Sequence, residues 1–248
     1  AWLGALAYLR SVGGEQFDLV VDVDDPRPGM ASSRVIAALD YLLERSHLQL
    51  VRTVANTIFP AQLARTSVTP DILVSRYLEI YPRIRRQRGN NRGTYFGRVT
   101  NYSLRDEGGS PVNQLSILID DLRTELGHRL LGKGAKRHLY EIQVFAPGRD
   151  RRPQGFPCMS SMSFHIDREQ LRLTATYRNQ YYVERALGNF LGLAELQEYV
   201  SGQVRLCQGP LTIHAFHAEI DRTVGSADVN DLLDRYRDLA ASTPVEAR

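Results

Sequence analysis

Cysteines, net charge and long apolar runs are all scarce in this sequence. It contains two cysteines, Cys158 and Cys207, whose spacing fits neither a disulfide framework nor a cysteine-rich zinc site, so we expect a reducing, cytoplasmic environment. The net charge of +3 over 248 residues is too small to indicate a nucleic-acid or membrane surface by itself. The apolar segment 1–9 ends at Arg10 and is too short to span a bilayer, so we expect a helix packed on the core.

Linkers, repeats and low-complexity tracts are also missing. No segment is rich enough in proline, glycine or serine to separate two folded units. Hydrophobic residues make up 43% of the chain and charged residues 24%, which is ordinary for a globular protein. We therefore expect a single domain over residues 1–248, with no membrane partner.

Periodicity predicts strands and helices in mixed order. Alternation of apolar and polar residues predicts strands at 17–23, 140–144, 162–166, 171–177 and 211–215, with a hairpin turn at 167–170. Helical spacing predicts helices from Ser32 or Ser33 to Leu43, from Asn113 to Leu126 with Gly127 ending it, and around 193–200 and 229–239. Hairpins combined with separate helices predict an α+β fold.

Cys158 closes the segment Gly155-Phe156-Pro157-Cys158 between two predicted strands. A thiolate attacks electron-poor carbon well when nearby cationic groups lower its pKa. Arg151 and Arg152 lie just upstream and are such groups. On the local sequence alone, however, a small buried hydrophobic residue is the favoured interpretation of a free cysteine. Cys207 lacks such neighbours, so we expect it to be structural.

Two polar residues after Cys158 are candidates for ligand binding. Arg178 follows a predicted strand, where its planar guanidinium suits a phosphate, although an ion pair with Glu184 is the alternative. Asn189 precedes an apolar helix, so it could cap that helix. Its carboxamide could instead pair with the donor–acceptor edge of a nucleobase. On the local sequence alone, the ion pair is favoured for Arg178, whereas both alternatives stay open for Asn189.

Two basic segments, 83–93 and 133–138, raise the question of nucleic-acid binding. Only Tyr95 and Phe96 accompany the first segment, and single-strand binding sites normally interleave several aromatic residues with basic ones. A phosphate-binding loop or a solvated loop is favoured, with Arg92 as the substrate-binding candidate. We therefore do not expect a nucleic-acid partner.

Histidines and carboxylates gather near the end of the last predicted strand. Alternation places His217, Glu219 and Asp221 on one face and His214 on the other. No neighbouring cysteine or paired-histidine helix motif supports a metal centre. We therefore expect no metal site.

The motifs around Cys158 together resemble the thymidylate synthase family, including its pyrimidine nucleotide hydroxymethylases. Phe156-Pro157-Cys158 is similar to the Pro-Cys nucleophile motif of that family and is the strongest single match. Arg178-Asn179 resembles the family's Arg-Ser phosphate-binding pair, and Asn189 matches the asparagine that reads the pyrimidine ring. Weaker similarity covers the segments 93–102 and 113–122, so the resemblance spans about half of the chain, from Gly93 to Asp221.

This resemblance implies a fold, a reaction and partners. The fold would be thymidylate synthase-like, with a large twisted mixed β-sheet flanked by helices. Cys158 would add to C6 of a pyrimidine nucleotide monophosphate, and C5 would take a one-carbon unit from 5,10-methylenetetrahydrofolate, giving methylation or hydroxymethylation. Asn189 would orient the base and stabilise charge developing on it. Arg178 would bind phosphate with Lys136 and Arg137 from the other protomer of a homodimer.

The sequence departs from the family pattern at several positions. Tyr181 stands where the family has an aspartate that contacts folate and supports proton transfer, so we expect it at the catalytic centre. Glu219 and Asp221 replace a His-x-Tyr pair that binds the sugar, and could accept hydrogen bonds from both hydroxyls of a ribose or reject the usual deoxynucleotide. Glu44 and Glu79 are the nearest candidates for the family's catalytic glutamate. These departures favour a specialised enzyme, with a catalytically altered nucleotide-binding protein as the alternative.

Overall fold

The computed structural model describes residues 1–27, 29, 31–87, 89–103, 110–133, 136, 140–150 and 157–241. Within these residues six strands form one sheet. The strands are β1 (Glu15–Val23), β2 (Tyr140–Gln143), β3 (Met159–Asp167), β4 (Gln170–Tyr177), β5 (Gln180–Tyr181) and β6 (Cys207–Glu219). The helices are α1 (Trp2–Ser11), α2 (Ser33–Arg45), α3 (Val51–Ile58), α4 (Ala61–Arg65), α5 (Pro70–Arg85), α6 (Tyr95–Thr100), α7 (Gln114–Leu130), the π-helical turn η2 (Tyr182–Ala186), α8 (Leu187–Val204), α9 (Ser226–Arg235) and α10 (Arg237–Ala241).

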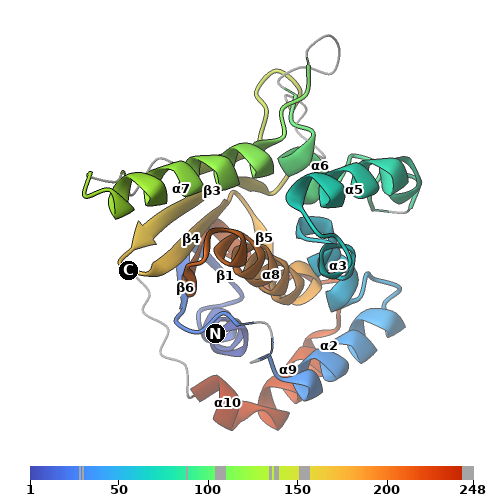
Figure 1. Cartoon of the computed structure of the whole chain (residues 1–248). Coiled ribbons are helices and arrows are strands. Elements are labelled where there is room, and N and C mark those ends of the chain that lie inside the picture. The colour runs from blue at the N-terminus through green and yellow to red at the C-terminus, as the bar shows by residue number, and fades with distance from the viewer. Residues whose placement is uncertain are drawn as a thin grey trace.

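The sheet is mixed, with the order β1-β6-β4-β3-β2 and β5 pairing with β6. β3 and β4 form an antiparallel hairpin, whose turn contains Arg168 with a φ of 56°. β4 and β6 pair in parallel, because α8 carries the chain back between them. β6 also pairs antiparallel with β1, and β2 pairs antiparallel with β3. The expected α+β fold with a mixed sheet flanked by helices is therefore confirmed (Figure 1).

α8 is the central helix of the core and determines where the site lies. Almost all of its residues are buried, and it packs on β4 and β6 on one side and on α3 on the other (Figure 1). Two glycines permit the contact with α3. A Cβ atom at Gly188 would lie 2.8 Å from the backbone oxygen of Val51, and one at Gly192 would lie 2.6 Å from that of Ala55. The two helices therefore meet at a distance that a larger residue does not allow.

Most local predictions agree with the structure, and two do not. Ser32 caps α2 by accepting from the backbone of Val35, and the predicted hairpin turn at 167–170 is confirmed. The predicted end of the helix at Gly127 is wrong, because α7 continues to Leu130 and nothing crowds Gly127 in its helical position. The predicted helix over 229–239 is also wrong as one element, because it breaks at Tyr236 into α9 and α10.

No helix among the described residues combines the length and the hydropathy that crossing a membrane requires.

Candidate active site

A pocket of about 280 Å³ lies where α3, α6, β5 and α8 meet. Five of the residues singled out from the sequence line it: Arg92, Cys158, Asn179, Tyr181 and Asn189. They come from four separate parts of the chain, so the fold brings them together. The volume is close to the lower end of the range for small-molecule sites.

Cys158 lies immediately before β3 and is half-buried. Its carbonyl oxygen accepts a hydrogen bond of 2.8 Å from the backbone nitrogen of Arg178, which ties the thiol to the end of the β3–β4 hairpin. Burial raises the pKa of the Cys158 thiol, while the charges of Arg178 and Arg185 oppose the rise. The thiol therefore keeps its proton at neutral pH in the free protein and must lose it before attacking a ligand. Arg151 and Arg152, the upstream cations singled out from the sequence, lie outside the described residues.

Asn189 is the third residue of α8, and the structure rules out a capping role for it. The helix follows directly from η2, and Ala186 occupies the N-cap position, so Asn189 has helical backbone on both sides. Its side chain is 4% exposed and lines the pocket. In the described part of the chain its carboxamide makes no hydrogen bond, although a buried amide normally has partners. Asn189 thus offers a donor and an acceptor to a ligand.

Asn179 and Glu219 are brought together at the rim of the pocket. The Nδ2 of Asn179 donates to Oε1 of Glu219 at 3.0 Å, and its Oδ1 lies 2.7 Å from Nδ1 of His217. His217 in turn approaches Glu15, with 3.4 Å between Nε2 and Oε2. This chain of contacts fixes the orientation of the Asn179 amide. Glu219 itself is not among the lining residues.

Asp221 does not line the pocket and instead accepts hydrogen bonds from the backbone. It is 6% exposed, and its Oδ2 accepts hydrogen bonds of 3.0 Å from the backbone nitrogens of both Val183 and Glu184. The carboxylate therefore satisfies the first free N–H groups of η2, where negative charge is favourable. The two carboxylates expected to bind a sugar thus have different surroundings, since only Glu219 reaches a pocket residue.

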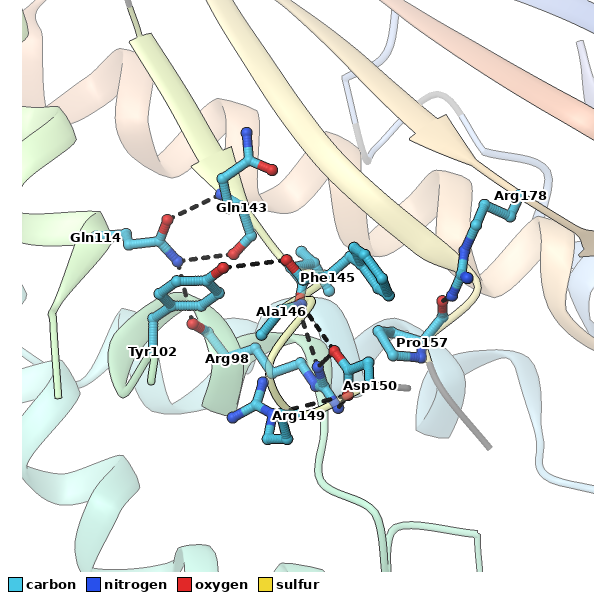
Figure 2. A network of polar contacts seen from close by, with 11 residues as sticks. Arg98, Tyr102, Gln114, Gln143, Phe145, Ala146, Arg149, Asp150, Pro157 and Arg178 are labelled. Carbon is cyan, nitrogen blue, oxygen red and sulfur yellow. Dashed lines mark hydrogen bonds and ion pairs between the residues drawn. The ribbon is translucent and has the colours of Figure 1, made fainter. Parts of the chain in front are cut away.

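Arg178 does not line the pocket but holds the segment that carries the nucleophile. Its Nη2 donates to the carbonyl oxygen of Pro157 at 2.6 Å, and its guanidinium lies 4.8 Å from the ring centroid of Phe145 (Figure 2). Glu184, the alternative partner considered from the sequence, forms an ion pair with Arg185 at 2.6 Å.

A buried polar network surrounds Arg98, which lines the pocket (Figure 2). Arg98 of α6 forms a bidentate ion pair with Asp150, with N–O distances of 2.6 and 3.0 Å, and also donates to the carbonyl oxygen of Val144 at 3.0 Å. Gln114 at the start of α7 donates to the carbonyl oxygens of Arg98 and Gln143. The network therefore joins α6, α7 and the segment after β2 into one support.

Tyr95 and Gln180 line the pocket but were not recognised from the sequence. Burial raises the pKa of the Tyr95 hydroxyl, and the proximity of Cys158 adds to the rise, so the hydroxyl keeps its proton beside the nucleophile. Tyr95 lies in the segment 93–102, to which the resemblance extends weakly, but no role was predicted for it. Gln180 lies between Asn179 and Tyr181, and no role was predicted for it either.

The remaining predicted residues lie elsewhere. Lys136 is exposed between α7 and β2, where its backbone nitrogen donates to Glu125 at 2.9 Å, and Arg137 lies outside the described residues. Glu44 and Glu79 are exposed and do not line the pocket. Among the described lining residues, every charged side chain is an arginine, so the pocket is suited to an anion.

The described residues contain no group of histidines, cysteines and carboxylates that could hold a metal ion. Comparisons with protein-family models and with curated proteins give no match. The resemblance to thymidylate synthases therefore rests on the motifs of the sequence alone.

Proposed function

We propose that this protein activates C5 of a pyrimidine nucleotide monophosphate for one-carbon transfer, through a covalent bond between Cys158 and C6. The observation that carries the proposal is that Cys158 and Asn189 line the same pocket, and that the Asn189 amide is buried there without a capping role. A thiol and a free carboxamide facing one small cavity are the two groups that this reaction requires of the protein.

In the proposed reaction, Cys158 and Asn189 each have a defined chemical role. The Cys158 thiolate forms a bond to C6, and the electron pair of the C5–C6 double bond moves toward the C4 substituent. Asn189 donates a hydrogen bond that stabilises the negative charge developing on the ring. C5 thereby becomes a carbon nucleophile. Once C5 has bonded to a one-carbon unit at the formaldehyde oxidation level, loss of the C5 proton and expulsion of the thiolate restore the ring. Addition of water to that unit gives a hydroxymethyl group, whereas a methyl group requires a hydride from a separate donor.

The cationic lining supports an anionic substrate. Arg92 lines the pocket and has an exposed side chain, and Arg185 of η2 lines the same pocket. Arg98 contributes less, because the carboxylate of Asp150 neutralises its charge. Arg185 also contributes less, because it is paired with Glu184. We assign the phosphate of the nucleotide to the side of the pocket that carries Arg92.

The one-carbon donor that the resemblance implies is 5,10-methylenetetrahydrofolate, which supplies a one-carbon unit to a carbon nucleophile. A carboxylate is the expected partner for the N–H groups of its ring system. Tyr181 stands at that position, and no carboxylate lines the pocket in the described residues. The described lining residues therefore do not fit a folate. For this reason the reaction is to be assayed both with and without methylenetetrahydrofolate.

The exposed face of the sheet supports a homodimer as the active unit. Residues of β3, β4 and β6 that alternate with the core residues are half-buried and mostly small and polar: Ser161, Ser163, Thr174, Thr176, Thr212 and His214. Such a face can pack against a second copy of itself. Lys136 does not line the pocket of its own protomer, so it would be available to the pocket of the other protomer.

Release of tritium tests the proposed reaction. The protein is incubated with 5-tritiated UMP, dUMP, CMP and dCMP, with and without methylenetetrahydrofolate, beside the variants Cys158→Ala and Cys207→Ser. We expect the unaltered protein and Cys207→Ser to release tritium from at least one nucleotide and Cys158→Ala to release none. The absence of release from all four nucleotides under both conditions would overturn the proposal.

A second candidate is a nucleotide-binding protein that has lost catalysis. It is favoured by the raised pKa of Cys158 and by the lack of a carboxylate among the described lining residues that could take its proton. Calorimetry separates the two. Nucleotide binding that survives Cys158→Ala, together with no tritium release by the unaltered protein, would favour the second candidate.

A further inference from the structure

Gln180 carries a buried amide for which the proposed reaction has no use. It lies in β5 between Asn179 and Tyr181, is 1% exposed and lines the pocket. Both polar atoms of its side chain, Oε1 and Nε2, are buried and make no hydrogen bond within the described residues.

Such an amide destabilises the free protein. An amide taken out of water without new hydrogen bonds loses its solvation and gains nothing in return. Gln197 of α8 shows how this chain accommodates a buried glutamine elsewhere. It is 0% exposed, and its Nε2 donates to the carbonyl oxygens of Leu171 and Gly209 at 2.8 and 2.9 Å. Gln180 differs in that it lines the pocket and that neither of its amide atoms has a partner within the described residues.

The backbone around Gln180 is well fixed. β5 pairs in parallel with β6, and Gln180 lies opposite Ala218. Asp221, just after β6, anchors the next segment through the backbone nitrogens of Val183 and Glu184. Gln180 is therefore held by strand pairing rather than by a loop, and sites built on strands are positioned more precisely than sites on loops.

The chemistry of the base leaves a place for a second amide. The polar edge of a pyrimidine consists of the C2 oxygen, N3 and the C4 substituent. One carboxamide has a single acceptor oxygen beside its NH2 group, so it pairs well with two adjacent groups of that edge. If Asn189 binds two of them, the third is left without a partner in the pocket.

We propose that Gln180 is a second base-reading residue, which binds the polar edge of the pyrimidine together with Asn189. This inference rests on the proposed function, because it takes the ligand to be a pyrimidine nucleotide. Binding of the base then satisfies an amide that is unpaired in the free protein. Replacing Gln180 by an apolar residue of similar size removes the recognition and also removes the unpaired group.

Two measurements on Gln180→Met test the inference, with Gln197→Met as the matched control. Calorimetry measures the affinity of the unaltered protein and of Gln180→Met for UMP, dUMP, CMP and dCMP. Thermal unfolding without nucleotide measures Tm for all three proteins. We expect Gln180→Met to bind about tenfold more weakly, the size of about one hydrogen bond in a pocket, with Tm unchanged or raised. Gln197→Met should lower Tm, because it removes satisfied hydrogen bonds.

Each result leads to a decision. If the unaltered protein binds a nucleotide and Gln180→Met binds it equally well, the inference is overturned and the proposed function stands. If the unaltered protein binds none of the four nucleotides, both are overturned. A Tm for Gln180→Met that falls as far as that of Gln197→Met, or a failure of this variant to fold, also overturns the inference. In that case the amide would be satisfied within the free protein.

Discussion

Replacing Asp150 by asparagine should strongly destabilise the buried polar network around Arg98. Asp150 is 9% exposed, and it accepts two hydrogen bonds from Arg98, which is 8% exposed, and one of 2.8 Å from the backbone nitrogen of Ala146. Asparagine keeps the shape of the side chain but not its charge, so the guanidinium of Arg98 stays buried without a counter-ion. Breaking a buried pair in this way costs about 3–5 kcal/mol of unfolding free energy.

Urea unfolding measures this loss, and an exposed ion pair provides the control. Arg129 and Glu169 form a contact of 2.7 Å, but their side chains are 43% and 75% exposed. Glu169→Gln should therefore cost only about 0.2–1 kcal/mol. With a urea slope of about 3 kcal/mol per molar, Asp150→Asn shifts the midpoint by about 1–1.7 M and Glu169→Gln by at most about 0.3 M.

The loss should also depend on pH. Burial alone would raise the pKa of Asp150, but the hydrogen bonds from Arg98 and Ala146 and the charges of Arg98 and Arg149 outweigh it and lower the pKa. The stabilisation is then fully present above the ordinary carboxyl pKa of about 4 and disappears as the pH falls through the lowered value. The gap between the unaltered protein and Asp150→Asn should narrow in acid. A midpoint shift no larger than that of Glu169→Gln would refute the reasoning.

Three further predictions concern the nucleophile, the helix contact and the buried carboxylate. Because burial raises the pKa of Cys158, its alkylation by iodoacetamide in a Cys207→Ser background should still accelerate above pH 9.0, the ordinary thiol value, and a plateau near neutrality would contradict this. Gly192→Ala places a Cβ atom 2.6 Å from the α3 backbone and should lower the free energy of unfolding in urea by about 1–3 kcal/mol. In Gly127→Ala the new Cβ atom meets nothing within 4 Å, so the free energy of unfolding should rise by about 0.5–1 kcal/mol. Equal effects of the two substitutions would argue against the close helix contact. Asp221→Ala should cost about 0.5–2 kcal/mol and leave nucleotide affinity unchanged, so weakened binding without a loss of stability would place Asp221 at the ligand.

Local patterns in the sequence predicted much of the secondary structure. The serine before α2 and the alternation on both sides of the turn at 167–170 are short-range signals, and the structure agrees with them. The order of the strands could not be predicted in this way. The parallel pairing of β4 with β6 depends on α8 packing over both strands, and that contact needs Gly188 and Gly192 to meet α3.

Local patterns in the sequence were also insufficient to predict the roles of residues in the candidate site. A polar residue near the start of a predicted helix fits both a cap and a ligand contact, so Asn189 stayed ambiguous until η2 showed that the helical backbone begins earlier. Asp221 was grouped with Glu219 by alternation, but hydrogen bonds to the backbone of η2 separate their roles. No role was predicted for Gln180, although its neighbours Asn179 and Tyr181 were recognised, because its burial results from the pairing of β5 with β6, a later part of the sequence.

The central claim is that the sulfur of Cys158 bonds to C6 of a pyrimidine nucleotide. Its most direct test is the mass of the protein after incubation with the 5-fluoro forms of UMP, dUMP, CMP and dCMP, with and without methylenetetrahydrofolate. Once C5 has bonded to a one-carbon unit, fluorine cannot leave C5 as a cation, so the thiolate is not expelled and the covalent adduct should accumulate. We expect at least one nucleotide to add its mass to the peptide that contains Cys158, in the unaltered protein and in Cys207→Ser but not in Cys158→Ala. An unchanged mass with every nucleotide, or an adduct that persists in Cys158→Ala, would contradict the claim.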